Sequence, residues 1–353
     1  MENLPRATAA LVLLASIGTA SAAAATSPTV ARARPLSLAP LKGHAVSVHS
    51  PFEVGDCSLC HERKNPRNPG AVTLAGDKGC TVCHEDFLEL AKSRRFKHTA
   101  EVGCTGCHNP HNATLKKLLL QATPSLCLGC HTGISAAMGQ KVKHAAVTEG
   151  ANCMNCHDPH ASNVEHLLTR LPFDQCVQCH GKDGVTDKDG VKLTNMKALL
   201  EQNKVHHGPV AQKDCSACHQ PHGSQTFRLL IAPYPSTFYA PFDAKTYELC
   251  FGCHDEKLVT AEKTTTATRF RDGDRNLHFL HVNKPDRGRT CRACHEVHAS
   301  QKNYQIRESV PFGSKGYLLK VNFEKRADGG NCTQTCHTGR SYTNAALPQA
   351  KAK

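Results

Sequence analysis

The sequence predicts a mostly irregular chain with short α-helices and little or no β-sheet, wrapped around a core that is not made of amino acids. Hydrophobic residues make up 39% of the 353 residues and tryptophan is absent, so side chains alone fill the interior poorly. All 20 cysteines fall into ten close pairs, and a histidine directly follows each pair. The interior is therefore expected to hold a group that these cysteines and histidines bind.

Nine of the pairs have the spacing C-x-x-C-H, which is typical of covalent attachment of a c-type haem. Two thiols add to the haem vinyl groups, and the histidine becomes the proximal ligand of the iron. Zinc ribbons need no histidine after each pair, and disulfide frameworks need no fixed spacing. The expected haem-bound cysteines are Cys57, Cys60, Cys80, Cys83, Cys104, Cys107, Cys127, Cys130, Cys153, Cys156, Cys176, Cys179, Cys215, Cys218, Cys250, Cys253, Cys291 and Cys294.

The tenth pair, Cys332 and Cys336, has one extra residue between its cysteines, and we expect a bulged loop there that still forms both thioethers. The sequence therefore predicts ten covalently attached c-type haems. Their proximal iron ligands are expected to be His61, His84, His108, His131, His157, His180, His219, His254, His295 and His337.

The ten sites are arranged as five two-haem units. The first cysteines of the two sites in a unit are 23 residues apart in the first three units, and 35 and 41 residues apart in the last two. Such regularity indicates a repeat architecture. The expected units are 44–95, 96–140, 141–190, 203–258 and 276–340.

Thirteen histidines remain, which exceeds the ten needed to give every iron a second histidine ligand. Each unit opens with a histidine before its first cysteine, and four units carry another histidine three residues after the first proximal one. The first unit lacks that histidine, and His44 is expected to replace it. The expected distal ligands are His49, His98, His144, His207 and His281, then His111, His160, His222 and His298, and finally His44.

His166, His206 and His278 are then surplus, although His206 and His207, or His278 and His281, could exchange roles. Opposed axial histidines need Cα atoms roughly 12 Å apart, and three residues span about 10 Å at most. His111, His160, His222 and His298 are therefore expected to ligate the iron of a neighbouring haem rather than their own.

The pattern C-x-x-C-H-x-P-H, an apolar stretch and a second C-x-x-C-H resembles the doubled-CXXCH-motif multihaem cytochromes c. With ten sites, the chain also resembles the periplasmic decahaem subunits of porin–cytochrome electron conduits. The resemblance implies redox protein partners, either quinol-linked cytochromes or outer-membrane conduit components. The first unit departs from the pattern, Val297 replaces the proline in CHEVH, and the last site is C-x-x-x-C-H.

The N-terminus resembles an export signal over residues 1–22. A short apolar run at 7–18 follows Arg6, and Ala20-Ser21-Ala22 is an A-x-A-type cleavage site. The run is too short to span a membrane. We expect a soluble mature protein in the periplasm or outside the cell.

The net charge of +13 does not indicate nucleic-acid binding, because the haem propionates change it. With ten haems the protein would carry about +3 when oxidised and about −7 when reduced. Basic side chains are expected to neutralise propionates, and no basic run is interleaved with aromatic residues.

The sequence thus predicts an electron carrier without catalytic residues, in which electrons hop between haems with two histidine ligands. Such ligation lacks the axial methionine that raises the potential, so anaerobic respiration or extracellular electron transfer fits best. One alternative is a multihaem oxidoreductase of nitrite, hydroxylamine or sulfur oxyanions, which would need an open iron. The other is a structural subunit of a haem filament.

Local patterns predict few other elements. Residues 85–92 are expected to form an amphipathic helix, and Thr194 to cap a helix that runs to Lys204. Residues 231–243 are expected to form a proline-rich loop, 183–190 a solvated turn rather than a calcium site, and 341–353 a disordered tail.

Intact mass spectrometry of the mature protein tests the cysteine assignment directly. Because ten Cys-Cys-His sites leave no cysteine over, the mass should exceed that of the polypeptide by ten haems. Nine additions would exclude attachment at Cys332 and Cys336.

Overall fold

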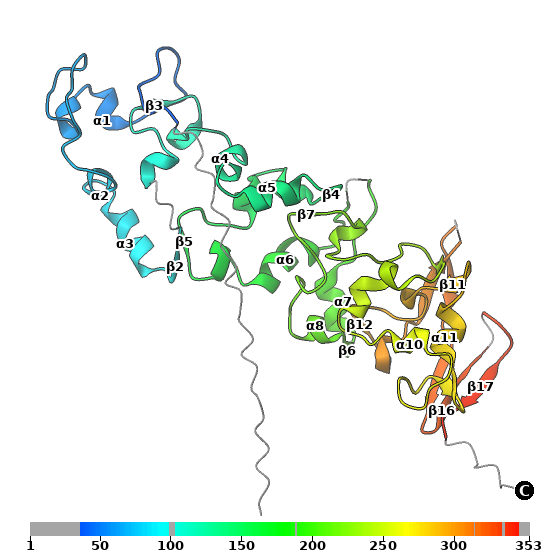
Figure 1. Cartoon of the computed structure of the whole chain (residues 1–353). Coiled ribbons are helices and arrows are strands. Elements are labelled where there is room, and N and C mark those ends of the chain that lie inside the picture. The colour runs from blue at the N-terminus through cyan, green and yellow to red at the C-terminus, as the bar shows by residue number, and fades with distance from the viewer. Residues whose placement is uncertain (1–35, 99–102, 188, 314, 334–335, 346–353) are drawn as a thin grey trace, which may run out of the picture. The chain divides into compact units, whose positions relative to one another are not determined.

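The computed structural model describes residues 36–98, 103–187, 189–313, 315–333 and 336–345. Within these ranges, short helices and strands are joined by long irregular segments (Figure 1). The expected signal peptide at 1–22 lies outside the described residues.

The first haem motif of a unit forms a single tight turn. The backbone N–H of His61 donates to the carbonyl of Cys57 at 2.8 Å, and corresponding bonds form in the other units. One helical turn brings residues three positions apart to the same face, so both cysteines point to one side. The four turns that form 3₁₀ helices are η1 (Cys57–Leu59), η2 (Cys104–Gly106), η5 (Asn152–Asn155) and η9 (Cys291–Ala293).

In the first four units the second motif begins instead on an α-helix, in α2 (Lys78–Thr81), α4 (Ser125–Leu128), α6 (Pro172–His180) and α9 (Glu248–Phe251). Flanking helices are α1 (Ser50–Glu53), α3 (Glu85–Ser93), α5 (Thr132–Met138), η4 (Ala145–Val147), α7 (Met196–Gln202), α8 (Gly208–Ala211) and α10 (Lys257–Thr260). The helix expected at 85–92 is thus confirmed as α3. Helix α7 is also present, but its cap is Asn195, whose side chain accepts from the N–H of Ala198, rather than Thr194.

Antiparallel pairs of two-residue strands tie each unit to the next one. Each pair joins the strand that opens one unit to a strand that follows the C-x-x-C-H-x-x-H segment of its successor. The pairs are β1 (Ser47–Val48) with β3 (Asn112–Ala113), β2 (Phe96–Lys97) with β5 (Ala161–Ser162), β4 (Val142–Lys143) with β7 (Gly223–Ser224), and β6 (Val205–His206) with β12 (Ala299–Ser300).

A second group of 3₁₀ turns follows the first motif of units two to five: η3 (Lys116–Leu118), η6 (Glu165–Leu167), η7 (Phe227–Leu229) and η10 (Asn303–Gln305). Each turn contains two successive non-glycine residues at positive φ, for example His166 at 57° and Leu167 at 55°. This conformation costs roughly 1–2 kcal/mol per residue, so surrounding contacts must stabilise it.

The C-terminal region contains more strand than the sequence predicts. Hairpin β13 (Ser309–Phe312) with β14 (Tyr317–Lys320) precedes a three-stranded sheet of β15 (Phe323–Arg326), β16 (Gly329–Cys332) and β17 (Arg340–Thr343). Strand β17 occupies the start of the expected tail at 341–353, so that prediction is wrong for residues 341–343. The remaining pairs are β8 (Tyr239–Ala240) with β11 (Gly288–Arg289), and β9 (Arg271–Asp272) with β10 (Arg275–Asn276). Strand β8 lies within the expected proline-rich loop.

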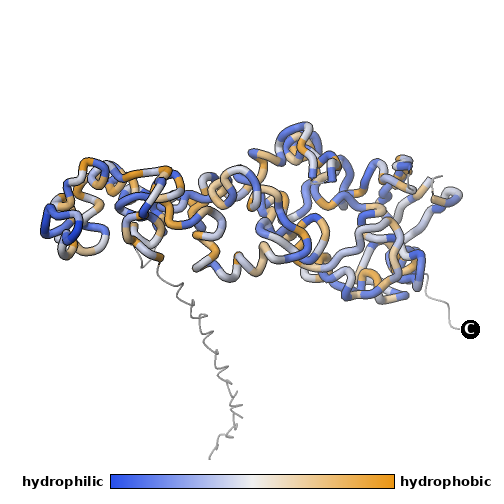
Figure 2. Tube along the Cα trace, turned by 90° about the horizontal axis from the view of Figure 1, so that it is seen from above, coloured by the Kyte–Doolittle hydropathy of each residue, from blue (hydrophilic) through white to orange (hydrophobic). Residues whose placement is uncertain are grey.

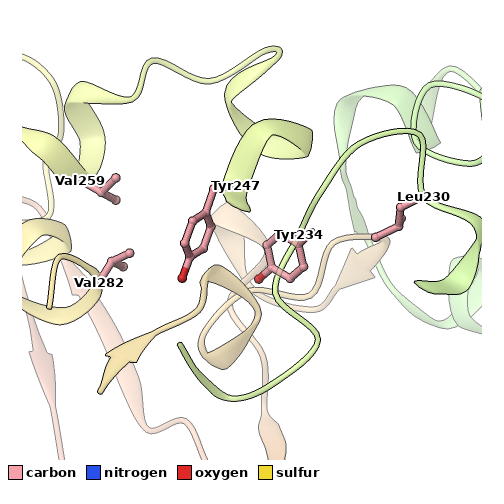
Figure 3. Close-up of a cluster of buried hydrophobic side chains, with 5 residues drawn as sticks. All are labelled: Leu230, Tyr234, Tyr247, Val259 and Val282. Atoms are coloured by element: carbon pink, nitrogen blue, oxygen red, sulfur yellow. The ribbon is translucent and has the colours of Figure 1, made fainter. Parts of the chain in front are cut away.

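Buried apolar side chains gather in one small cluster of the described chain, made of Leu230, Tyr234, Tyr247, Val259 and Val282 (Figure 3). Turn η8 (Ala244–Tyr247) and helix α11 (Leu277–Val282) each supply one of these residues. Elsewhere polar and apolar residues alternate along the trace, without a long apolar segment (Figure 2). The polypeptide therefore supplies little core of its own, as its composition predicts.

No helix of the described residues combines the length and the hydrophobicity of a membrane-spanning segment.

Asn276 is the most fully buried polar residue described, and it fixes the start of α11. Its amide donates to the carbonyls of Leu258 and Ala261 at 3.0 and 2.8 Å, and its side-chain oxygen accepts from the N–H of His278 at 2.9 Å. It therefore positions a helix that carries two histidines.

Replacing Asn276 by alanine should lower the free energy of unfolding by about 2 kcal/mol, because it removes a helix cap and leaves buried carbonyls without donors. Chemical denaturation of the haem-loaded protein measures the change. Asn195→Ala is the control, because that cap lies at the half-buried start of α7. An equal loss from both substitutions would contradict the special role of Asn276.

Candidate haem-binding site

Nine of the ten expected proximal histidines face a second histidine ring. The ring centres are 6.0–6.4 Å apart, and eight of the nine pairs have planes within 24° of each other. In chain order the pairs are His61–His111, His84–His49, His108–His160, His131–His98, His157–His222, His180–His144, His219–His298, His254–His207 and His295–His278.

The separation fits one metal ion between two imidazoles. A metal–nitrogen bond of about 2 Å on each side, plus roughly 1.1 Å from each ring centre to its nitrogen, gives about 6.2 Å. Direct stacking of two rings would bring their centres much closer than this. The spacing therefore leaves room for a haem iron in each of these nine pairs.

Hydrogen bonds orient the rings for this role. The Nδ1–H of His108 donates to the carbonyl of Lys117 at 2.8 Å, and His61, His157, His219 and His295 each donate in the same way to the residue nine positions further on. A ring that donates through Nδ1 keeps the lone pair of Nε2 free for a metal. In units two to five the accepting carbonyl belongs to the first positive-φ residue of η3, η6, η7 or η10. The strained turn therefore aims a carbonyl at the ring and orients it.

The rings of the expected distal histidines are held in the same manner. His49 donates from Nδ1 to the carbonyl of Pro110 at 2.9 Å, and His111 donates to that of Leu38 at 2.9 Å. The two backbones also join, because the N–H of His49 donates to the carbonyl of His111 at 2.8 Å. His98 with His160 and His207 with His298 repeat this backbone bond. One strand pair thus positions two of the expected distal histidines at once.

Burial favours the neutral form of three of the facing rings, His219, His278 and His295, and metal ligation requires neutral imidazole. It lowers the pKa of His219 and His295, and it lowers the pKa of His278 to about 4 with a further contribution from His295. A neutral imidazole is available as a ligand at physiological pH.

The doubled CXXCH motif family matches four segments of the chain: 49–89, 98–136, 144–185 and 207–258. Each segment contains two of the Cys-Cys-His sites. The protein is a multihaem c-type cytochrome. It is also similar to the multiheme cytochrome MtrA of Shewanella baltica (strain OS185), with 27% identity over 111 residues. That match covers 28% of this chain and 33% of the relative, so the chain spans about a third of the length of this curated relative.

Two rules describe the pairing in the first four units of the cytochrome. The second motif of a unit meets the histidine that opens the same unit, as His84 meets His49. The first motif of a unit meets the histidine three residues after the first proximal histidine of the next unit, as His61 meets His111. Neighbouring units therefore interlock through their histidines, in line with the distance argument from the sequence.

His44 does not take the place expected for it. Its side chain is exposed, and none of the ring contacts of the described residues includes it. His61 already faces His111, while His278, expected to be surplus, faces His295. The first unit carries no histidine three residues after His61. In the fifth unit, α11 supplies His278 to face His295 from within the same unit.

The remaining histidines have clear positions. His206 bonds through Nε2 to the carbonyls of Leu200 and Asn203 at 3.0 and 2.9 Å, and so closes the end of α7. His166 is exposed, and its backbone carbonyl accepts a hydrogen bond from Nδ1 of His157. His281 is half-buried. Desolvation lowers its pKa, and charge on His337 acts in the same direction, so these two histidines lie near each other.

Thiols of consecutive sites also lie together. Four pairs of thiols from successive units lie close together: Cys104 and Cys80, Cys127 and Cys153, Cys176 and Cys215, and Cys250 and Cys291. Within units, burial raises the pKa of Cys60, Cys107, Cys156, Cys218 and Cys294. Nearby charge on Cys80, Cys130, Cys179, Cys250 and Cys336, in the same order, also acts to raise it. Every site therefore adjoins the next one in chain order.

Substitution of His278 and of His44 tests which of the two is an iron ligand. His278→Ala should convert one low-spin haem to high spin, because it removes the ring that faces His295. His44→Ala should leave all haems low-spin. Electron paramagnetic resonance of the oxidised proteins counts the high-spin haems. A high-spin haem in His44→Ala and none in His278→Ala would instead support His44 as the ligand, as the sequence predicts.

Proposed function

We propose that the chain is an exported decahaem cytochrome that carries electrons between redox partners along bis-histidine haems. The observation that carries the proposal is the set of nine facing histidine pairs at iron-spanning distance. We assign His281 and His337 as the tenth pair, on the strength of their proximity and their place in the repeat. Bound haem supplies a one-electron iron couple, and the chain supplies its position and surroundings.

Two features of the chain support electron transfer over catalysis. Two histidines at each site would occupy both axial positions of a bound haem iron, which would leave no position for a substrate. The proximity of cysteines from consecutive sites would hold the bound haems next to each other, in the order in which the chain binds them. The five two-haem units would thus form one continuous path.

The expected export signal at 1–22 supports a location in the periplasm or outside the cell, where c-type haems are attached. Likeness to a multiheme cytochrome MtrA supports partners that are themselves redox proteins, such as quinol-linked cytochromes or components of an electron conduit. Two axial histidines give low potentials, which suits anaerobic respiration.

Ligand binding to the reduced protein tests the proposal. Because each iron would carry two histidines, carbon monoxide should bind to far less than one haem in ten, and added nitrite or hydroxylamine should not be turned over. The protein should still exchange electrons rapidly with several unrelated redox partners. A stoichiometric carbon monoxide adduct with turnover of one substrate would instead support the oxidoreductase alternative.

A further inference from the structure

One position of the repeat changes its charge from unit to unit. It is the residue directly after the first proximal histidine of units two to five, two residues before a distal histidine. In chain order it is Asn109, Asp158, Gln220 and Glu296. Two of the four are neutral amides, and two are carboxylates.

Each of these side chains acts on the distal histidine that follows it. Side-chain oxygens of Asn109 and Asp158 accept from the backbone N–H of His111 and His160, both at 2.9 Å. Gln220 accepts from that of His222 at 3.4 Å. Glu296 reaches the ring itself, with Oε1 3.6 Å from Nδ1 of His298. The position therefore supports the second ligand of the preceding unit's first haem.

The two carboxylates place a negative charge beside a ligand ring. Oδ1 of Asp158 lies 3.9 Å from Nδ1 of His160, in addition to the Glu296 contact with His298. His111, which follows the neutral Asn109, instead donates from Nδ1 to the carbonyl of Leu38. Four equivalent haems thus differ in the charge next to their distal ligand.

Because Glu296 is more buried than Asp158, its charge acts more strongly on the neighbouring histidine ring. Its side chain is 23% exposed, whereas that of Asp158 is 46% exposed. Arg307, itself 10% exposed, pairs with Glu296 at 2.7 Å and also donates to the carbonyl of His295. This pair fixes the carboxylate in place and offsets part of its charge, while water screens the remaining field less than that of Asp158.

We propose that Glu296, and more weakly Asp158, lower the reduction potentials of the haems ligated by His298 and His160. This inference rests on the bis-histidine ligation proposed above. A carboxylate beside an imidazole N–H makes the ring a stronger electron donor, which favours ferric over ferrous iron. Its negative charge acts in the same direction. Counted along the chain, the third and seventh haems (those of His108 and His219) would then have lower reduction potentials than the first and fifth (those of His61 and His157).

Potentiometric titration of the full haem-loaded chain tests the proposal with Glu296→Gln. This substitution keeps the shape and removes the charge. About one tenth of the haem absorbance should titrate at a higher potential, with the ratio of reduced to oxidised haem raised about tenfold at a fixed potential, or about 59 mV for one electron. The reverse change, Gln220→Glu, should move one tenth of the absorbance to a lower potential.

Glu308→Gln is the matched control. Glu308 also belongs to the fifth unit and pairs with a cation, Lys302 at 3.2 Å, but its side chain is 66% exposed. This variant should titrate like the native protein. Equal shifts from Glu296→Gln and Glu308→Gln would show a general charge effect and overturn the proposal.

Unchanged titrations for both Glu296→Gln and Gln220→Glu, in proteins with ten low-spin haems, would also overturn it. His298→Ala separates this outcome from failure of the proposed ligation. That variant should gain one high-spin haem if His298 is a ligand, whatever the effect of Glu296. A fully low-spin His298→Ala protein would reject the ligation itself.

Discussion

The structure depends on an exchange of histidines between successive units. In the first four units, the expected proximal histidine of the first motif faces a ring from the following unit. His108 meets His160, and His157 meets His222, so the third unit takes part in both contacts. A metal between such rings would be a strong and directional link across the boundary between units. Two-residue strand pairs lie beside these contacts and bring the ligands together.

This constraint explains why so little apolar core is needed. The described chain has one small apolar cluster, near Tyr247, and mostly partly exposed residues elsewhere. In such a chain, haems bound through twenty cysteines and twenty histidines would replace the missing core. Folding and cofactor attachment are then coupled, as they are in small metal-binding domains. Haem binding would also offset the energetic cost of the left-handed turn at His166, because the carbonyl of that residue orients the ring of His157.

Much of the candidate site could be predicted from the sequence, because covalent attachment fixes the spacing of its residues. The cysteine pairs, the proximal histidines and the need for a neighbouring unit's histidine all follow from local distances. His278 could not be assigned in this way, because His278 and His281 lie three residues apart and the sequence does not show which ring faces His295. Only the number of histidines favours His44 as a distal ligand. Because His111 of the second unit faces His61, the first unit does not need His44 in this role.

Parts of the fold outside the repeat were less predictable. The three-stranded sheet of β15, β16 and β17 forms through pairing across sequence with little alternation, and its glycines at 329 and 330 are poor strand formers. Asn195 and Thr194 are both acceptable caps, and only the backbone conformation selects Asn195. The contact of Glu296 with His298 depends on a turn whose geometry the sequence pattern does not specify.

A structure of the haem-loaded protein that resolves the axial ligands would test the exchange of histidines most directly. The account predicts that His160 lies on the iron of the haem bound to Cys104 and Cys107, which belongs to the preceding unit. Finding His160 on the haem of Cys153 and Cys156, or on no iron, would contradict it.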